Sequence, residues 1–158
     1  KHVDVSTITP FAYNTLVFVG KGQPRAAALE QIVSLNRIAI GSPGSVPAGK
    51  YALEAIKKSG VDRALDKKLV MTKDVLECLM YVERGEVDGA FIYASNTLEM
   101  SKRVKVLFEV PQDFYSRVIY PMALTNAGAE NRDAKAFFEF LQSETAGAVL
   151  SRYGFIIE

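Results

Sequence analysis

Short apolar runs alternate with amphipathic segments between residues 14 and 93, and this alternation limits the folds open to the chain. The runs are rich in β-branched residues and several end at glycine, which is typical of buried strands. Between them, apolar residues recur three and four positions apart, as on one face of a helix. Such alternation predicts an α/β fold with a mainly parallel sheet, because crossover helices join parallel strands. The expected strands are 14–19, 38–40, 69–71 and 89–93, and the expected helices are 26–35, 50–59 and 73–84.

The ends of the chain follow a different pattern. Residues 1–13 contain Pro10 and no clean period, so we interpret them as a connector. Residues 104–110 predict a further strand. Another is expected at 116–125, where a proline indicates a sheet edge or a bend. The C-terminal part predicts helices, and we expect its phenylalanines in the core with one ring at the surface: Phe137, Phe138 and Phe140.

Composition excludes several classes of function. The 158 residues suit one domain, and 19 Lys+Arg against 18 Asp+Glu give a net charge of +1. This balance argues against a broad basic surface for nucleic acid. No apolar run approaches the ~20 residues that span a bilayer. One cysteine, Cys78, and one histidine, His2, leave no multi-cysteine metal site and little for histidine chemistry. We therefore predict no catalytic residues, no metal coordinated directly by side chains and no cofactor.

Three segments follow the carboxyl ends of expected strands, where ligands usually bind in such sheets. They are 41–49, 71–75 and 93–97. The first two lead into helices, whose initial N–H groups lack partners and attract anions. Small residues in the first segment would let a ligand approach the backbone, and we take Thr72 as the N-cap in the second. The alternative interpretation is that these segments are connections and that Tyr93 is structural. The candidate positions are Ala48 beside Gly49 in the first segment, the free N–H of Val75 in the second and the hydroxyl of Tyr93 in the third.

Four stretches resemble the family of bacterial periplasmic molybdate-binding proteins, the receptors of ABC-type molybdate importers. They follow one another in the family's order and spacing over nearly the whole chain. The stretches are IAIGSPGSVPAGKYALEAI (38–56), KDVLECLMYVERGEVDGAFIYASN (73–96), VIYPMALT (118–125) and AFFEFLQSETAGAVLSRYGFIIE (136–158). NTLVFV (14–19) is similar to the strand by which that family crosses between its two lobes.

The resemblance implies a type II periplasmic binding protein fold, in which two α/β lobes close on molybdate or tungstate. It implies oxyanion binding by the Ala48 N–H, the Val75 N–H and the Tyr93 hydroxyl, which lie in the same three segments that the helix starts and the strand end indicate. It also implies a membrane permease as partner and a periplasmic or otherwise extracytoplasmic location, with a lipid anchor as one option. The expected activity is capture of an oxyanion rather than catalysis.

The chain also departs from the family. Ser42 stands where the family usually has an acidic residue, and nothing matches the family's first lobe. We therefore expect 1–13 to be a connector from a missing first lobe, 14–120 the oxyanion-binding α/β lobe and 121–158 a C-terminal crossing strand and helices. A fragment that lacks about half of the ligand shell should bind weakly. It could form a homodimer through the surface that the absent lobe exposes.

Two other functions are weighed against this one. The same fold could serve as the oxyanion-sensing effector domain of a transcription regulator, but this would require a DNA-binding segment that these residues do not supply. An enzyme would need a nucleophile–base pair or a metal cluster. The acidic cluster of Glu83, Glu86 and Asp88 is better explained as a solvated helix end, and Cys78 as an inert buried thiol.

Overall fold

The computed structural model describes residues 2–21 and 26–158, which divide into two compact units. Unit 2 is Thr15–Arg117, and unit 1 combines the residues up to Asn14 with Val118–Glu158. The chain thus leaves unit 1 after its first strand and returns to it for the C-terminal part. The functional division into a connector, an oxyanion-binding lobe at 14–120 and C-terminal elements stays a prediction.

Unit 2 is built on a five-stranded sheet of β2 (Leu16–Lys21), β3 (Ile38–Gly41), β4 (Leu69–Thr72), β5 (Gly89–Tyr93) and β6 (Val104–Glu109). The strand order is β4-β3-β5-β2-β6. Strand β3 pairs in parallel with β4 and β5, whereas β2 pairs antiparallel with β5 and β6. Four strands therefore point the same way and β2 runs against them, which confirms the expected mainly parallel α/β sheet.

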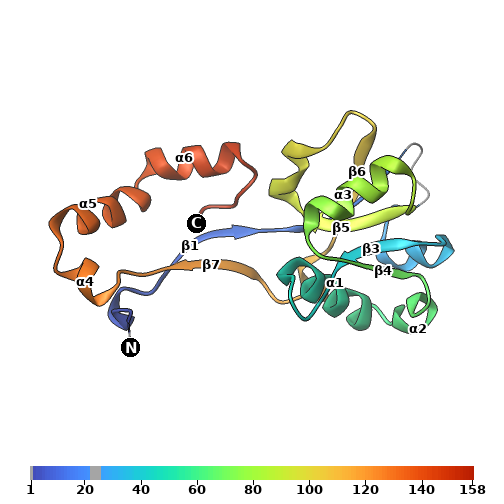
Figure 1. The fold of residues 1–158 in the computed structure, drawn as a ribbon, viewed down its shortest axis with the longest axis horizontal. Helices are drawn as coiled ribbons and strands as arrows, with labels where there is room; N and C mark the ends of the chain where they lie inside the picture. Colours follow the sequence, from blue (N-terminus) through green and yellow to red (C-terminus); the bar gives the residue numbers. More distant parts are fainter. Residues whose placement is uncertain (1, 22–25) are drawn as a thin grey trace. The chain divides into compact units, whose positions relative to one another are not determined.

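Helices of unit 2 flank this sheet on both sides, as Figure 1 shows for α1 and α3. The α-helices are α1 (Pro47–Lys58), α2 (Asp62–Leu65) and α3 (Val75–Arg84). The 3-10 helices η2 (Leu29–Ser34), η3 (Ala94–Glu99) and η4 (Gln112–Phe114) lie in the connections between strands. Two of the expected α-helices are thus confirmed, with shifted starts. The helix expected at 26–35 is wrong, because the described part of that segment forms a short 3-10 helix instead.

Alternate residues of the strands face the two sides of the sheet and give unit 2 a core on each. On one side Phe18 packs against Phe91 and Phe108, with ring centroids 4.9 and 5.2 Å apart. Gly89 leaves room for the Phe18 ring, which a Cβ there would overlap. The other side packs against α3, and its buried cluster contains Val17, Val19, Ala39, Ala90, Ile92, Cys78, Leu79 and Val82. This two-sided packing fixes the strand ends from which the candidate site is built.

Unit 1 consists of a two-stranded ribbon and helices: η1 (Val5–Thr7), β1 (Thr9–Asn14), β7 (Val118–Met122), α4 (Asn126–Ala129), α5 (Arg132–Leu141) and α6 (Glu144–Arg152). Residues 9–13, within the expected connector, thus belong to a strand. Pro10 pairs with Pro121 and the register shifts between Pro10 and Ala12. The bulge interrupts the period-2 pattern, which explains why the sequence gives no strand signal there. Pro121 lies in a two-stranded ribbon, in line with the expected sheet edge.

The apolar side of helix α5 is exposed to solvent. None of its described residues is buried, and Phe137 and Phe140 stack at 6.3 Å while remaining 60% and 48% exposed. The expectation that the C-terminal phenylalanines form core is therefore wrong for this chain. A ribbon of two strands offers too little apolar surface to cover an amphipathic helix, as an isolated pair of strands rarely builds a core.

Candidate functional site

The three predicted segments meet at one edge of the unit 2 sheet. Strands β3, β4 and β5 run in the same direction and end at Gly41, Thr72 and Tyr93. Beyond the strands the pairing continues, since the Ser42 N–H donates to the Thr72 carbonyl at 2.8 Å. The starts of α1 and α3 and the end of β5 are therefore gathered at the carboxyl edge, where ligands bind in sheets of this kind (Figure 1).

A tight turn between β3 and α1 positions Ala48. The Ser42 carbonyl accepts hydrogen bonds from the N–H groups of Ser45 and Val46, at 3.0 and 2.8 Å. Pro47 then takes the first position of α1, where its missing N–H costs no hydrogen bond. Ala48 follows with only 1% of its surface exposed. Within the described part of the chain, no acceptor is paired with the Ala48 N–H, as expected for the first turn of a helix.

Two glycines bring α1 against the end of β3. A Cβ on Gly49 would overlap the carbonyl group of Gly41, and a Cβ on Gly41 would overlap the side chain of Val46. The sequence interpretation was that small residues here leave room for a ligand. For Gly49 this reason is wrong, because the space is filled by the chain's own backbone. The glycine instead lets the helix start at the strand end.

The start of α3 is held by two side chains that cap it from both directions. Asp74 is the N-cap, and its carboxylate accepts from the Glu77 N–H at 2.8 Å. Glu77 in turn accepts from the Lys73 N–H at 2.8 Å. The expectation that Thr72 caps this helix is therefore wrong, because its hydroxyl is buried and donates inward. Val75 is the first residue of α3, and no described acceptor is paired with its N–H.

The buried hydroxyl of Thr72 ties the end of β4 to α3. It lies 2.9 Å from the Asp74 carbonyl, 3.3 Å from the Ile40 carbonyl and 3.0 Å from the Cys78 sulfur. Burial raises the pKa of the Cys78 thiol to about 11, an effect that Asp74 and Glu77 reinforce and the Thr72 hydrogen bond opposes. The thiol therefore stays protonated at neutral pH and packs as a structural group.

Tyr93 is half-buried at the end of β5 and has Leu16 of β2 as its cross-strand partner. Its ring lies 6.5 Å from that of Tyr51, which belongs to α1 one turn after Ala48. Tyr51 is not among the site residues predicted from the sequence. The spacing of three residues between Ala48 and Tyr51 was the available signal, since residues three apart share a helix face.

The acidic cluster near the end of α3 holds backbone groups together. One Asp88 carboxylate oxygen accepts from the N–H groups of Asn36 and Arg37, at 2.7 and 3.0 Å. Glu83 accepts from the Ser101 N–H at 3.2 Å, and Glu86 lies 3.8 Å from Arg84. Over residues 2–21 and 26–158, no group of three His, Cys, Asp or Glu side chains could hold a metal ion. The same residues contain no helix both long and apolar enough to cross a membrane.

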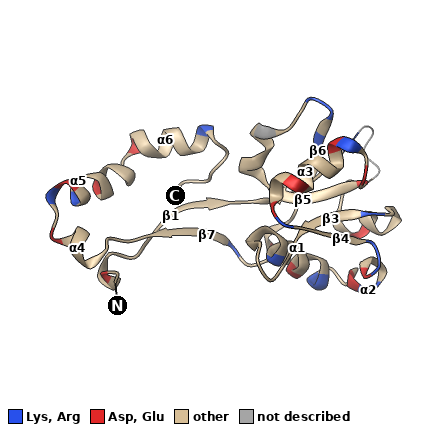
Figure 2. Cartoon of the chain, in the orientation of Figure 1, with Lys and Arg blue, Asp and Glu red and all other residues tan. Residues whose placement is uncertain are grey.

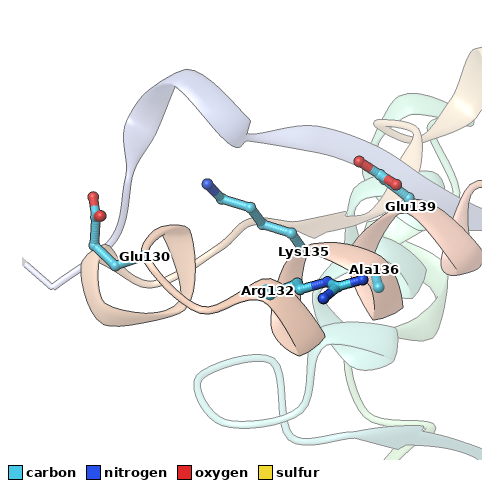
Figure 3. A pocket seen from close by; sticks show the side chains of 5 residues that line it. All are labelled: Glu130, Arg132, Lys135, Ala136 and Glu139. Atoms are coloured by element: carbon cyan, nitrogen blue, oxygen red, sulfur yellow. The ribbon is translucent and has the colours of Figure 1, made fainter.

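Unit 1 contains a hollow of about 440 Å³ that is a weaker candidate for an anion. It is lined by Glu130, which follows α4, and by Arg132, Lys135, Ala136 and Glu139 of α5. Figure 3 shows the charged ends of Arg132 and Lys135 pointing in different directions, with the carboxylates of Glu130 and Glu139 on opposite sides of them. Figure 2 shows acidic and basic residues interspersed along both units. Two carboxylates would oppose a bound anion, so the carboxyl edge of the unit 2 sheet remains the candidate site.

Solved structures share the fold of the chain. The substrate-binding domain of a proposed molybdenum ABC transporter from Clostridium difficile superposes with a TM-score of 0.87 at 30% identity, covering 100% of this chain and 70% of that one. The periplasmic molybdate-binding protein of Azotobacter vinelandii gives a TM-score of 0.79 at 16% identity, covering 99% and 71%. These likenesses confirm the expected type II periplasmic binding protein fold.

Sequence comparison finds longer relatives. The chain is 35% identical over 143 residues to the proposed ABC transporter substrate-binding lipoprotein YvgL of Bacillus subtilis, covering 90% of this chain and 55% of that protein. It is 34% identical over 169 residues to the molybdate-binding protein ModA of Escherichia coli, covering 100% and 64%. The chain thus spans less than two thirds of the length of either relative. The sequence model of the family described as bacterial extracellular solute-binding protein matches residues 1–156, and the chain belongs to that family.

Proposed function

We propose that the chain is the oxyanion-binding part of the substrate-binding component of an ABC importer, and that it captures molybdate or tungstate. One observation carries the proposal: two helix starts with N–H groups that have no described acceptor lie at the same sheet edge as Tyr93. The relatives support the choice of ligand, since ModA of Escherichia coli is named as a molybdate-binding protein. The substrate-binding role rests on the names of YvgL and of the Clostridium difficile domain.

In this proposal the ligand is held by neutral donors. The N–H groups of Ala48 and Val75 and the hydroxyl of Tyr93 donate to oxyanion oxygens, and the dipoles of α1 and α3 favour the negative charge. A site made of fixed dipoles selects for the size and shape of the oxyanion, whereas an exposed cation would attract any anion. The role is reversible capture and delivery, without a chemical step or a resident cofactor.

The partner of such a protein is the membrane permease of the importer, and its location is periplasmic or otherwise extracytoplasmic. The name of YvgL as a lipoprotein supports a lipid anchor as one form of attachment. We also propose that two copies can associate through the exposed apolar side of α5, around Phe137 and Phe140. Light scattering over a wide concentration range tests this association, and a monomer at every concentration would contradict it.

A titration with three oxyanions tests the proposed function. In ¹⁵N-resolved NMR spectra, molybdate and tungstate should shift the amide signals of Ala48 and Val75, because these N–H groups would donate to the ligand. Sulfate is smaller, so donors at fixed positions would contact it less closely and its effect should be weaker. We expect the chain alone to bind less tightly than the longer relatives, because it spans only part of their length.

The Tyr93 hydroxyl is tested by removing it. Tyr93→Phe should weaken molybdate binding about tenfold or more, because a hydrogen bond to a charged group contributes about 1.5–3 kcal/mol. Tyr153→Phe removes a hydroxyl from an exposed ring of unit 1 and should bind like wild type. Absence of any response to millimolar molybdate, or equal affinity for molybdate and sulfate, would contradict the proposal.

A further inference from the structure

Three tyrosine rings of unit 2 form a continuous line, with Tyr51 in the middle. The Tyr51 ring meets that of Tyr93 at a centroid distance of 6.5 Å and an angle of 61°. It meets that of Tyr115 at 6.2 Å and 68°. Both contacts are edge-to-face, the arrangement that aromatic rings favour because the positive edge of one faces the negative face of the other. Tyr51 is therefore partly buried, with its ring packed against two others.

The far end of this line is anchored on the strand that pairs with Tyr93. Tyr115 is buried, and its hydroxyl accepts from the Leu16 N–H at 3.0 Å. Burial raises the pKa of the Tyr115 hydroxyl, in keeping with a fixed and poorly hydrated group. Leu16 is in turn the cross-strand partner of Tyr93. Tyr93 and Tyr115 are thus connected in two ways, through the ring of Tyr51 and through Leu16 of β2.

We propose that Tyr51 is a positioning residue, which holds the Tyr93 ring so that its hydroxyl meets the bound oxyanion. This inference rests on the proposed function, because it deepens the role of Tyr93 in that same site. Tyr51 also lies one turn beyond Ala48 on α1, so the helix that supplies one donor orients the ring that supplies another. A movement of α1 would therefore carry the Ala48 N–H and the Tyr93 ring together, and the distance between these two donors would be kept.

Substitutions at position 51 separate the ring from its hydroxyl. Tyr51→Leu removes the aromatic edge and should weaken molybdate binding about three- to tenfold, in line with the strength of aromatic pairs. Tyr51→Phe keeps the ring and should bind within about twofold of wild type. If the leucine variant does not fold, Tyr51→Met takes its place, because it keeps most of the side-chain volume without a flat ring.

A double-mutant cycle with Tyr93→Phe decides whether Tyr51 acts through the Tyr93 hydroxyl. In the Tyr93→Phe background, Tyr51→Leu should cost less than about twofold in affinity, because the hydroxyl that it positions is already gone. A merely structural role would weaken binding by the same factor in both backgrounds. In ¹³C-tyrosine NMR spectra the Tyr93 signals are those that Tyr93→Phe removes, and Tyr51→Leu should shift these signals while Tyr51→Phe leaves them nearly unchanged.

The outcomes distinguish this inference from the function on which it rests. If wild type does not bind molybdate, the proposed function fails and the inference fails with it. If wild type binds and Tyr51→Leu binds equally well, only the inference is overturned. Equal losses in both backgrounds, or a loss in Tyr51→Phe as large as in Tyr51→Leu, would also overturn it.

Discussion

Replacing Gly49 by alanine is expected to destabilise unit 2 by about 3 kcal/mol and to remove molybdate binding. The new Cβ would overlap the carbonyl group of Gly41, which belongs to the end of β3 and cannot rotate away as a flexible side chain could. Either the first turn of α1 unwinds or the helix moves off the strand. Both responses displace the Ala48 N–H. Chemical denaturation followed by circular dichroism measures the loss of stability, and the oxyanion titration measures the loss of binding.

Gly44→Ala is the matched control for this prediction. Gly44 lies in the same loop, and a Cβ there would meet nothing within 4 Å. Its φ angle is not positive, so alanine can adopt the backbone conformation without strain. The control should fold and bind like wild type, with a stability that is unchanged or slightly raised because alanine restricts the unfolded chain. Equal stability of Gly49→Ala and Gly44→Ala would show that the close contact between α1 and β3 does not matter.

The sequence pattern predicts those helices and strands whose apolar residues recur regularly and are buried in the structure. Strands β3 and β5 are entirely or largely buried, and α1 and α3 have clear apolar faces, so their positions could be read from periodicity alone. Strand β1 could not, because the Pro10 bulge breaks its alternation. The exposure of the α5 phenylalanines could not be predicted either. An apolar stripe indicates which side of a helix can be buried, but not whether another element covers it.

For the candidate site too, local patterns predict one part, and contacts between distant elements determine the rest. Its location could be predicted because helix starts and parallel strand ends are visible in the sequence, and the three segments do meet at one sheet edge. The supporting contacts depend on distances between elements far apart in sequence. Gly49 is small because Gly41 lies against it, and the Tyr51 ring lies between Tyr93 and Tyr115. No local pattern encodes either contact, so the sequence indicates the proposed donors but not the residues that pack against them.

Replacing Val75 by proline is expected to remove one proposed donor and leave α3 in place. Val75 is the first residue of the helix, where proline is favoured because its φ angle suits a helix and its missing N–H was without an intrahelical partner. The preceding residue, Asp74, has φ −158° and ψ 176°, the extended conformation that a following proline requires. Molybdate affinity should fall about 10- to 100-fold, because an oxyanion oxygen that loses its donor costs about 1–3 kcal/mol.

Val75→Ala isolates the N–H from the side chain. Val75 packs against the buried cluster between α3 and the sheet, so both substitutions lose some packing and should show similar, small losses of stability. Only proline also removes the N–H. Alanine should therefore bind molybdate nearly as wild type does, and proline should not, although both melt at similar temperatures. If proline and alanine bind equally well, the Val75 N–H is not a ligand donor. If proline alone unfolds α3, as circular dichroism would reveal, this residue is not the first of the helix in solution.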